Sequence, residues 1–373
     1  MVFDLDGPSR YHRQAILPGI GEAGQARIRR GRVAVVGCGA LGTVVIDHLA
    51  RAGVGELVLI DRDVVEATNL QRQMLFTEDD VREGQPKAAA AAAAVARINH
   101  EVLVHAAVRD LRASNALTLL AGADVIVGGL DSFETRYLLN DVAVSTGRPY
   151  VYGGAVGTGG LSFAILPQTG ARDAPATSGE PDSRVHWTPA QATPCLRCIF
   201  DQPPPPGTGP TCDTAGILAP VSATVAARQA IETLKLLAGR ADAVDRRMVS
   251  LDLWDGSHRA IDLDDARRPD CPCCGQHRFE WLTGRGETDT TVLCGREAVH
   301  VRPAGDQPVD LARIAARLET LGPIVRTEYL VRGRLPGEAP AVDLTLFADG
   351  RALLHGISDP DMGRRLYARY VGC

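Results

Sequence analysis

The stretch VAVVGCGALG, residues 33–42, joins an apolar β-branched run to glycines with the spacing G-x-G-x-x-G. Gly37 permits a tight turn, Gly39 lets the backbone approach a phosphate, and Gly42 lets a helix pack closely on the preceding strand. The N-terminus of that helix would then face the anion. The pattern therefore predicts a nucleotide-binding turn.

The next apolar run ends in an acid that fits the same kind of site. ELVLID, residues 56–61, ends at Asp61, which lies about 20 residues after Gly42, where a carboxylate binds the ribose in dinucleotide-binding folds. These features alone favour an NAD-dependent oxidoreductase.

Charged and amide residues then change the expected chemistry. They form the series DRDVVEATNLQRQ at residues 61–73, and GQPK follows at residues 84–87. A redox site has no general need for such a series, whereas cleavage of ATP between its α- and β-phosphates needs cations on the triphosphate. Arg72 and Lys87 could supply them, since Lys87 begins a predicted helix.

Asp131 adds a carboxylate to the predicted cations Arg72 and Lys87. It follows the apolar run DVIVGG, at the carboxyl edge of the predicted sheet, where α/β folds hold their ligands. A carboxylate at that edge can hold Mg²⁺. The combined pattern favours ATP chemistry over hydride transfer.

Cysteine spacing predicts a separate metal site. The chain has nine cysteines. Because we expect no secretion signal, they favour metal binding or catalysis over a disulfide framework. Two C-x-x-C pairs, at Cys195 and Cys198 and at Cys271 and Cys274, predict a four-thiolate zinc site that is structural because no coordination position is left open. Cys273 could replace a neighbour, but the spacing favours the two pairs.

The elements that must position these residues follow a Rossmann-like doubly wound α/β pattern, in which short apolar runs alternate with helical stretches. The predicted strands are RVAVVG, ELVLID, VLVHAAV, DVIVGG, PYVYGG and LSFAILP. We expect helices between Pro86 and Asn99 and over residues 219–238, strands near residues 246–263, and a mixed sheet overall. Residues 168–193 and 201–211 are predicted loops because they are rich in Pro, Gly and polar residues.

The chain is long enough for two domains. We expect residues 1–280 to form the ATP-binding domain and residues 285–373 a small α+β domain, with helices over 309–322 and 361–372 and a hairpin turn at ADGRA. We find no chemical motif in the second domain. Its lone Cys294 and Cys373 are predicted to be packed or exposed, not catalytic.

Composition limits the classes of partner. A formal net charge of −5 argues against a general nucleic-acid-binding or membrane-surface protein. No uninterrupted apolar stretch is long enough to cross a membrane, so we expect a cytoplasmic protein with small-molecule or protein partners.

Eight segments resemble, in order, the MoeB/ThiF branch of the E1-like adenylyltransferases. They are RYHRQ, GCGALG, LIDRDVVEATNLQRQ, GQPK, DSFETRYLLND, PCLRCIF, TCDTAGILAP and DCPCCG. The resemblance covers about residues 8–280. It implies homodimers that use ATP and Mg²⁺ to adenylate the C-terminal glycine of a ubiquitin-like sulfur-carrier protein ending in Gly-Gly. Because the chain lacks a clear rhodanese loop, we expect a separate persulfide donor to supply the sulfur.

The resemblance also implies roles for single residues. Gly37, Gly39 and Gly42 would surround the nucleotide, with Asp61 on the ribose and Asp63 beside it. The remaining assignments are Asn69, Arg72 and Lys87 on the phosphates, Asp131 on Mg²⁺, Arg13 in the partner subunit's site, and Cys212 as the cysteine that accepts the acyl group in some members.

The sequence departs from the family pattern at two positions. Thr68 stands where the family usually has Ser, and Ser132 stands where it usually has Asn. Thr68 keeps a hydroxyl, whereas Ser132, predicted to contact the nucleotide, is shorter than the usual amide. The alternatives left open are adenylation of a peptide, small-molecule or tRNA-bound carboxylate, a dehydrogenase, and a catalytically inactive scaffold.

Overall fold

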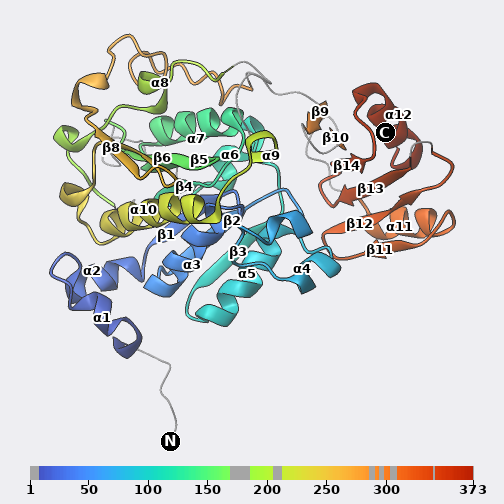
Figure 1. The fold of residues 1–373 in the computed structure, drawn as a ribbon, viewed down its shortest axis with the longest axis horizontal. Coiled ribbons are helices and arrows are strands. Elements are labelled where there is room, and N and C mark those ends of the chain that lie inside the picture. The colour runs from blue at the N-terminus through green and yellow to red at the C-terminus, as the bar shows by residue number, and fades with distance from the viewer. Residues whose placement is uncertain are drawn as a thin grey trace, which may run out of the picture. The chain divides into compact units, whose positions relative to one another are not determined.

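The computed structural model describes residues 8–168, 185–204, 212–284, 290–293, 298–302, 309–338 and 341–372. It divides into two compact units, Met1–Arg285 and Gly286–Cys373, and each is described by itself (Figure 1). Among the described helices, none has both the length and the apolar character that a membrane crossing requires.

The first unit is built on an eight-stranded mixed sheet with the order β3-β2-β1-β4-β5-β6-β7-β8. The first five strands are parallel to one another, and β6, β7 and β8 continue the sheet antiparallel. The strands are β1 (Arg32–Val36), β2 (Glu56–Ile60), β3 (Leu103–Ala107), β4 (Val125–Gly128), β5 (Tyr150–Val156), β6 (Gly159–Ile165), β7 (Met248–Asp252) and β8 (Ser257–Ile261). The predicted Rossmann-like mixed sheet is confirmed.

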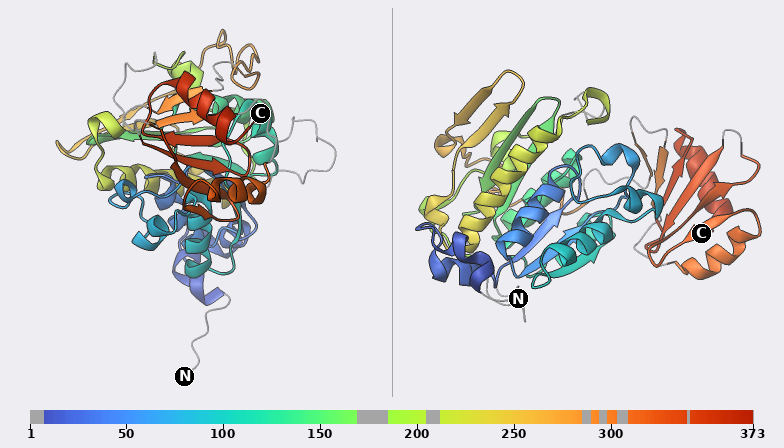
Figure 2. Two further views of the ribbon diagram at one scale, coloured as in Figure 1. Left: turned by 90° about the vertical axis from the view of Figure 1, so that its right-hand side faces the viewer. Right: turned by 60° about the horizontal axis from the view of Figure 1, so that its bottom comes forward.

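Helices cover both faces of this sheet. One face packs against α3 (Gly42–Ala52), α5 (Lys87–Ile98) and α10 (Ala219–Leu237), and the other against α6 (Ala113–Leu119), α7 (Phe133–Thr146) and α8 (Leu196–Ile199). α10 runs beside α3 and over β5 and β6 (Figure 2). The predicted helices after Pro86 and over residues 219–238 are therefore present.

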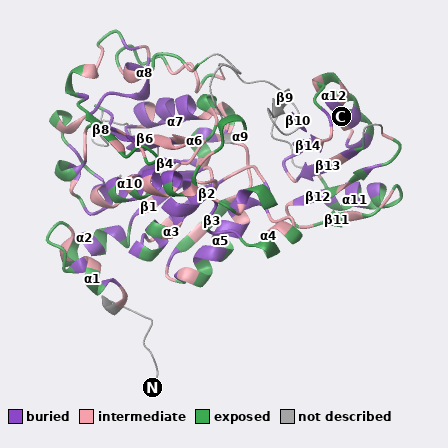
Figure 3. Cartoon of the chain, in the orientation of Figure 1, coloured by how far each residue is buried: buried purple, intermediate pink, exposed green. Residues whose placement is uncertain are grey.

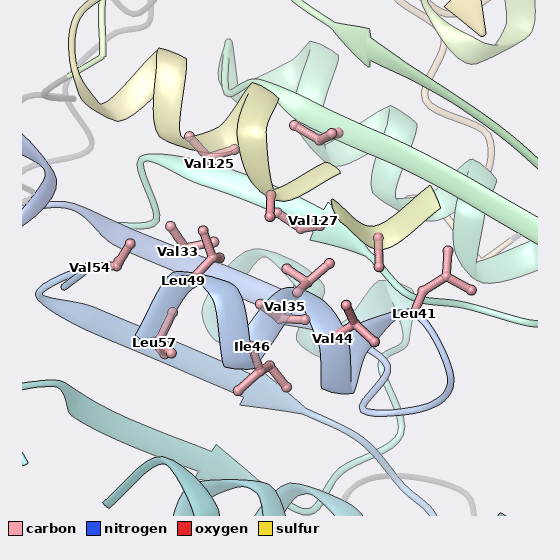
Figure 4. Close-up of a cluster of buried hydrophobic side chains, with 14 of the residues drawn as sticks. Val33, Val35, Leu41, Val44, Ile46, Leu49, Val54, Leu57, Val125 and Val127 are labelled. Carbon is pink, nitrogen blue, oxygen red and sulfur yellow. The ribbon is translucent and has the colours of Figure 1, made fainter. Parts of the chain in front are cut away.

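Alternation along the strands explains the two covered faces. Val33 and Val35 of β1 belong to the cluster beneath α3 (Figure 4), whereas Ala34 and Val36 belong to the cluster on the α7 side. Successive side chains of a strand point to opposite faces, and a parallel sheet covered on both faces needs apolar residues on each. The inner strands β1, β2 and β4 are accordingly buried through most of their length, whereas the edge strands β3 and β8 are mostly exposed (Figure 3).

Short elements complete the first unit. They are η1 (Pro8–Tyr11), α1 (His12–Ala15), α2 (Gly21–Ile28), η2 (Ala67–Asn69), α4 (Glu78–Arg82), η3 (Pro189–Gln191), α9 (Cys212–Ala215), η4 (Ala241–Ala243) and η5 (Asp264–Ala266). Of the two predicted loops, residues 169–184 and 205–211 lie outside the described residues.

The second unit is a six-stranded antiparallel sheet with the order β11-β12-β13-β14-β10-β9. The strands are β9 (Thr290–Leu293), β10 (Ala298–Val301), β11 (Ile324–Arg326), β12 (Leu330–Leu335), β13 (Val342–Phe347) and β14 (Ala352–His355). Apolar residues of the sheet pack against α11 (Leu311–Glu319) and α12 (Pro360–Tyr370), as expected for a small α+β fold. Gly350 has φ +85° in the predicted hairpin turn. Cys294 and Cys373 lie outside the described residues.

Candidate active site

The glycine turn between β1 and α3 is tightly packed except at one position. Gly37 has φ +89°, and an added Cβ there would overlap the backbone of Gly129, which follows β4. An added Cβ at Gly42 would overlap the carbonyl oxygen of Gly37. At Gly39 the nearest atom would be 3.9 Å away. The turn is therefore closed against its own chain and open at Gly39, which suits an incoming phosphate. Gly129 was not among the predicted site residues, although the Gly-Gly pair after an apolar run signals it.

Asp61 lies directly against this turn. Its Oδ2 accepts a hydrogen bond from the backbone N–H of Cys38 at 2.6 Å, and its Oδ1 accepts one from that of Asp63 at 2.7 Å. Burial raises the pKa of Asp61, and the positive charge of Lys87 opposes that shift. Because a carboxylate oxygen accepts more than one hydrogen bond, Asp61 retains acceptor capacity for a ribose hydroxyl.

Lys87 is a buried cation beside three carboxylates. Its Nζ lies 3.1 Å from Asp63 Oδ2, and its side chain is 6% exposed. Its backbone N–H donates to the Asp63 carbonyl at 2.9 Å, which fixes the start of α5 beside the end of β2. Burial lowers the pKa of Lys87, but Asp63, Asp61 and Asp131 outweigh that effect and raise it. Lys87 therefore stays protonated at neutral pH.

Two buried amides next to the turn carry polar atoms that have no hydrogen-bond partner among the described residues. Asn69 is fully buried; its Oδ1 accepts from the Glu66 N–H at 3.0 Å, whereas no described residue bonds its Nδ2. Gln73 is 3% exposed, and no described residue bonds its Oε1. Unpaired buried polar groups are costly, so these atoms suit a polar ligand. Asn69 was predicted. Gln73 was missed, although it closes the same motif.

Hydrogen bonds fix this amide segment to the glycine turn. The Met74 N–H donates to Thr43 Oγ1 at 3.2 Å, and that hydroxyl donates to the Gly39 carbonyl at 2.8 Å. Arg72 is half-buried, and its Nη1 donates to the Thr68 carbonyl at 2.7 Å. The predicted Asn69 and Arg72 therefore lie on one short segment anchored next to Gly39.

Asp131 is exposed in the loop between β4 and α7. Ser132 is the N-cap of α7, where its Oγ accepts from the Thr135 N–H at 3.5 Å. The buried Arg136 donates through Nη2 to the Leu130 carbonyl at 2.6 Å. Asp131 is thus held between a helix cap and a buried guanidinium. The predicted nucleotide contact of Ser132 stays a prediction beside this capping role.

Arg62 is a cation of this edge that sequence reasoning did not select. Its Nη1 lies 3.1 Å from Asp110 Oδ1, and its Nε lies 3.8 Å from Asp63 Oδ1. Burial lowers the pKa of Arg62, but Asp110, Asp63 and Asp131 together raise it. Its position between Asp61 and Asp63 in LIDRD was the available signal.

The four cysteines predicted to bind zinc come together. Their sulfur atoms all lie within 4.8 Å of one another; Cys195 and Cys271 are 3.6 Å apart, and Cys198 and Cys274 are 3.4 Å apart. Zn–S bonds of about 2.3 Å in a tetrahedron place sulfur atoms about 3.8 Å apart. The geometry therefore fits a four-thiolate metal site.

Two buried residues of α7 support this cluster. Asn140 accepts from the Leu196 N–H at 2.8 Å and donates to Cys273 Sγ at 3.2 Å. Asp141 accepts from the Trp281 N–H at 2.8 Å. Cys273 therefore acts as a hydrogen-bond partner of Asn140 beside the four-cysteine cluster, and α7 contacts both cysteine pairs.

One predicted residue, Arg13, lies apart from the residues around the glycine turn. Arg13 is exposed on α1. Its neighbour Tyr11 accepts a hydrogen bond from Asn99 at 2.8 Å and packs against Gly53, the C-cap of α3. Arg13 thus lies by the end of α3 opposite the glycine turn.

Cys212 begins α9, but its side chain lies outside the described part of the structure. The Gly157 N–H, at the turn after β5, donates to the Gly216 carbonyl at 2.8 Å, and the Leu218 N–H donates to the Gly157 carbonyl at 3.0 Å. The end of α9 is therefore tied to the carboxyl edge of the sheet, the edge that carries the site.

Comparison with known proteins decides the family. The model of the ThiF family matches residues 11–273. The chain belongs to the ThiF family. The Sulfur carrier protein ThiS adenylyltransferase of Bacillus subtilis (strain 168) is 37% identical over 364 residues, which are 97% of this chain and 99% of that protein. An alignment of that length includes most of the second unit.

Other similar proteins align with a shorter part of this ThiF-family chain. The SAMP-activating enzyme E1 of Haloferax volcanii is 40% identical over 278 residues, which are 74% of this chain and 93% of that protein. The crystal structure of E. coli MccB with ATP has a TM-score of 0.56 at 24% identity and covers 72% of this chain and 75% of that chain. At that identity the MccB likeness shows a shared fold.

Proposed function

We propose that this ThiF-family protein adenylates the C-terminal glycine of a ubiquitin-like sulfur-carrier protein at the expense of ATP. The observation that carries the proposal is the buried Lys87, held beside Asp63 and next to a glycine turn that is open at Gly39. Beside this turn no described residue bonds the Asn69 Nδ2 donor, which suits a phosphate oxygen, or the Gln73 Oε1 acceptor, which suits a donor such as a nucleotide hydroxyl. The Bacillus subtilis relative, which is named an adenylyltransferase, supplies the reaction class and argues against the oxidoreductase alternative.

The chemistry needs alignment and charge neutralisation. The terminal carboxylate of the carrier attacks the α-phosphorus of ATP, pyrophosphate leaves, and an acyl-adenylate forms. Because that carboxylate is itself the nucleophile, no enzyme general base is needed. Lys87 and Arg72 would neutralise the phosphates, and Asp61 would hold the ribose. Asp131 would hold Mg²⁺, which supplies Lewis-acid stabilisation of the phosphate charge.

Further assignments extend this proposal. All the predicted site residues lie in the first unit, so we assign adenylation to it. The cysteine cluster would hold a structural zinc, because its four thiolates complete a tetrahedron. We also propose a homodimer in which Arg13 serves the partner subunit's site, which fits its position away from the glycine turn of its own chain. A separate persulfide donor would supply the sulfur.

Carrier-dependent pyrophosphate exchange tests the adenylation. The purified chain, ATP, Mg²⁺ and a Gly-Gly-ending carrier should incorporate labelled pyrophosphate into ATP. A carrier that lacks its terminal glycine should give background exchange, because the nucleophilic carboxylate is then misplaced. Exchange that occurs with a peptide or a small carboxylic acid, but not with any sulfur carrier, would replace the proposed substrate.

Cys212 is proposed to act after adenylation, when its thiolate attacks the acyl carbon of the acyl-adenylate, a thioester forms and AMP leaves. Its variant should therefore separate the two steps. Cys212→Ser should retain pyrophosphate exchange, because acyl-adenylate formation needs only carrier, ATP and Mg²⁺. Thiocarboxylate formation with a persulfide donor should fall at least about tenfold, because a thiolate is a far better nucleophile than a hydroxyl. Mass spectrometry of the carrier measures the product. Survival of both activities would remove the covalent role, and loss of both would place Cys212 in the adenylation site.

A further inference from the structure

The side chain of Arg62 bridges the ends of two neighbouring strands. Arg62 follows β2, and Asp110, its partner at 3.1 Å, lies in the segment after β3. The nearby Asp63 carboxylate, 3.8 Å from Nε, restrains the other end of the guanidinium. Its plane is therefore fixed between two carboxylates.

Asp110 is itself held in place. Arg112 Nε lies 3.5 Å from Asp110 Oδ2, and Asn115 Nδ2 donates to the Asp110 carbonyl at 3.0 Å. The Asp110 side chain is 11% exposed, whereas that of Arg62 is 28% exposed. The carboxylate is thus largely covered, and part of the Arg62 side chain is exposed at the site edge.

The order of the strands indicates which part of the nucleotide would meet Arg62. The sheet runs β3-β2-β1-β4, the glycine turn follows β1, and Asp61 follows β2. With the phosphates on the turn and the ribose on Asp61, the base continues away from the phosphates toward β3. The Arg62–Asp110 pair lies in that direction.

We propose that the guanidinium of Arg62, held by Asp110, is the surface on which the adenine ring of ATP stacks. A planar guanidinium binds aromatic faces through stacking and cation–π attraction, and the pairing with Asp110 orients it before the nucleotide arrives. The inference rests on the proposed use of ATP and adds a base-binding residue to that site.

Comparing ATP with a ligand that lacks the base tests this assignment. We would measure the Kd of ATP and of inorganic tripolyphosphate for the full chain by calorimetry. Arg62→Met should weaken ATP binding about tenfold, as expected for loss of one stacked base, and leave tripolyphosphate binding unchanged. Arg62→Lys should retain part of the ATP affinity, because it keeps the positive charge but loses the planar guanidinium. Arg51→Met is the matched control, because it removes an exposed cation that pairs with Asp47 on α3, and it should bind both ligands normally.

The outcomes separate this inference from the proposed function. An equal loss of affinity for both ligands would place Arg62 on the phosphates and overturn the inference. Wild-type affinity for ATP in Arg62→Met and Arg62→Lys would overturn it as well. Normal ATP binding without carrier-dependent pyrophosphate exchange would overturn the proposed function alone.

Discussion

Lys87→Met should lower carrier-dependent pyrophosphate exchange by about a thousandfold. The substitution keeps the length of the side chain and removes a buried ammonium that lies 3.1 Å from Asp63. The carboxylates of Asp61, Asp63 and Asp131, which raise the pKa of Lys87, then lose that compensating charge. The site would repel the triphosphate instead of neutralising it, so the exchange rate should fall together with ATP affinity.

The chain offers one matched control for this variant. Lysine occurs only at Lys87 and Lys235, and Lys235 forms an ion pair with Glu232 at 2.8 Å on α10. Such a partly exposed pair contributes at most about 1 kcal/mol, so Lys235→Met should exchange pyrophosphate normally. Thermal unfolding of both variants checks that the fold is intact. Near-normal exchange by folded Lys87→Met would remove Lys87 from the catalytic residues.

The fold could be predicted because local pattern and tertiary packing agree. In β1, Val33 and Val35 face one layer of helices while Ala34 and Val36 face the other, so an unbroken apolar run is what a doubly covered strand requires. The glycine turn could also be predicted from the sequence, because Gly37 adopts φ +89°, a backbone conformation that residues with a side chain disfavour. The family resemblance is confirmed by the ThiF match over residues 11–273.

The candidate site could be predicted only in part. The family resemblance assigned Asn69 to the phosphates, the place of Lys87 at a helix start singled it out, and spacing alone separated Cys271 and Cys274 from the adjacent Cys273. Gln73 was not predicted, because the burial of its Oε1 without a partner among the described residues results from packing and cannot be read from the residue type. Arg62 was not predicted, because it follows β2 whereas its partner Asp110 follows β3. Only the order of the strands in the sheet brings the two residues together. The catalytic roles of all these residues remain predictions.

Removal of one zinc ligand should have the largest effect on stability. Cys271→Ser should lose the metal and lower the free energy of unfolding by about 4 kcal/mol or more, because loss of a metal belongs to the most destabilising class of change. The melting temperature should fall by about 10 °C. Loss of the metal should also destabilise α7, because Asn140 of this helix forms hydrogen bonds with Leu196, between Cys195 and Cys198, and with Cys273, next to Cys274. Elemental analysis and thermal unfolding measure both results.

Cys273→Ser tests whether the assignment of ligands is correct. Cys273 is as buried as Cys271, but it lies outside the four-sulfur cluster, and a serine hydroxyl can still accept the hydrogen bond from Asn140. This variant should keep about one zinc per chain and melt close to the wild type. Below its melting temperature Cys271→Ser should still exchange pyrophosphate, because four protein ligands leave zinc no open position for substrate. If Cys271→Ser retained zinc and Cys273→Ser lost it, Cys273 and not Cys271 would be the zinc ligand. A folded wild type without zinc would refute the metal site.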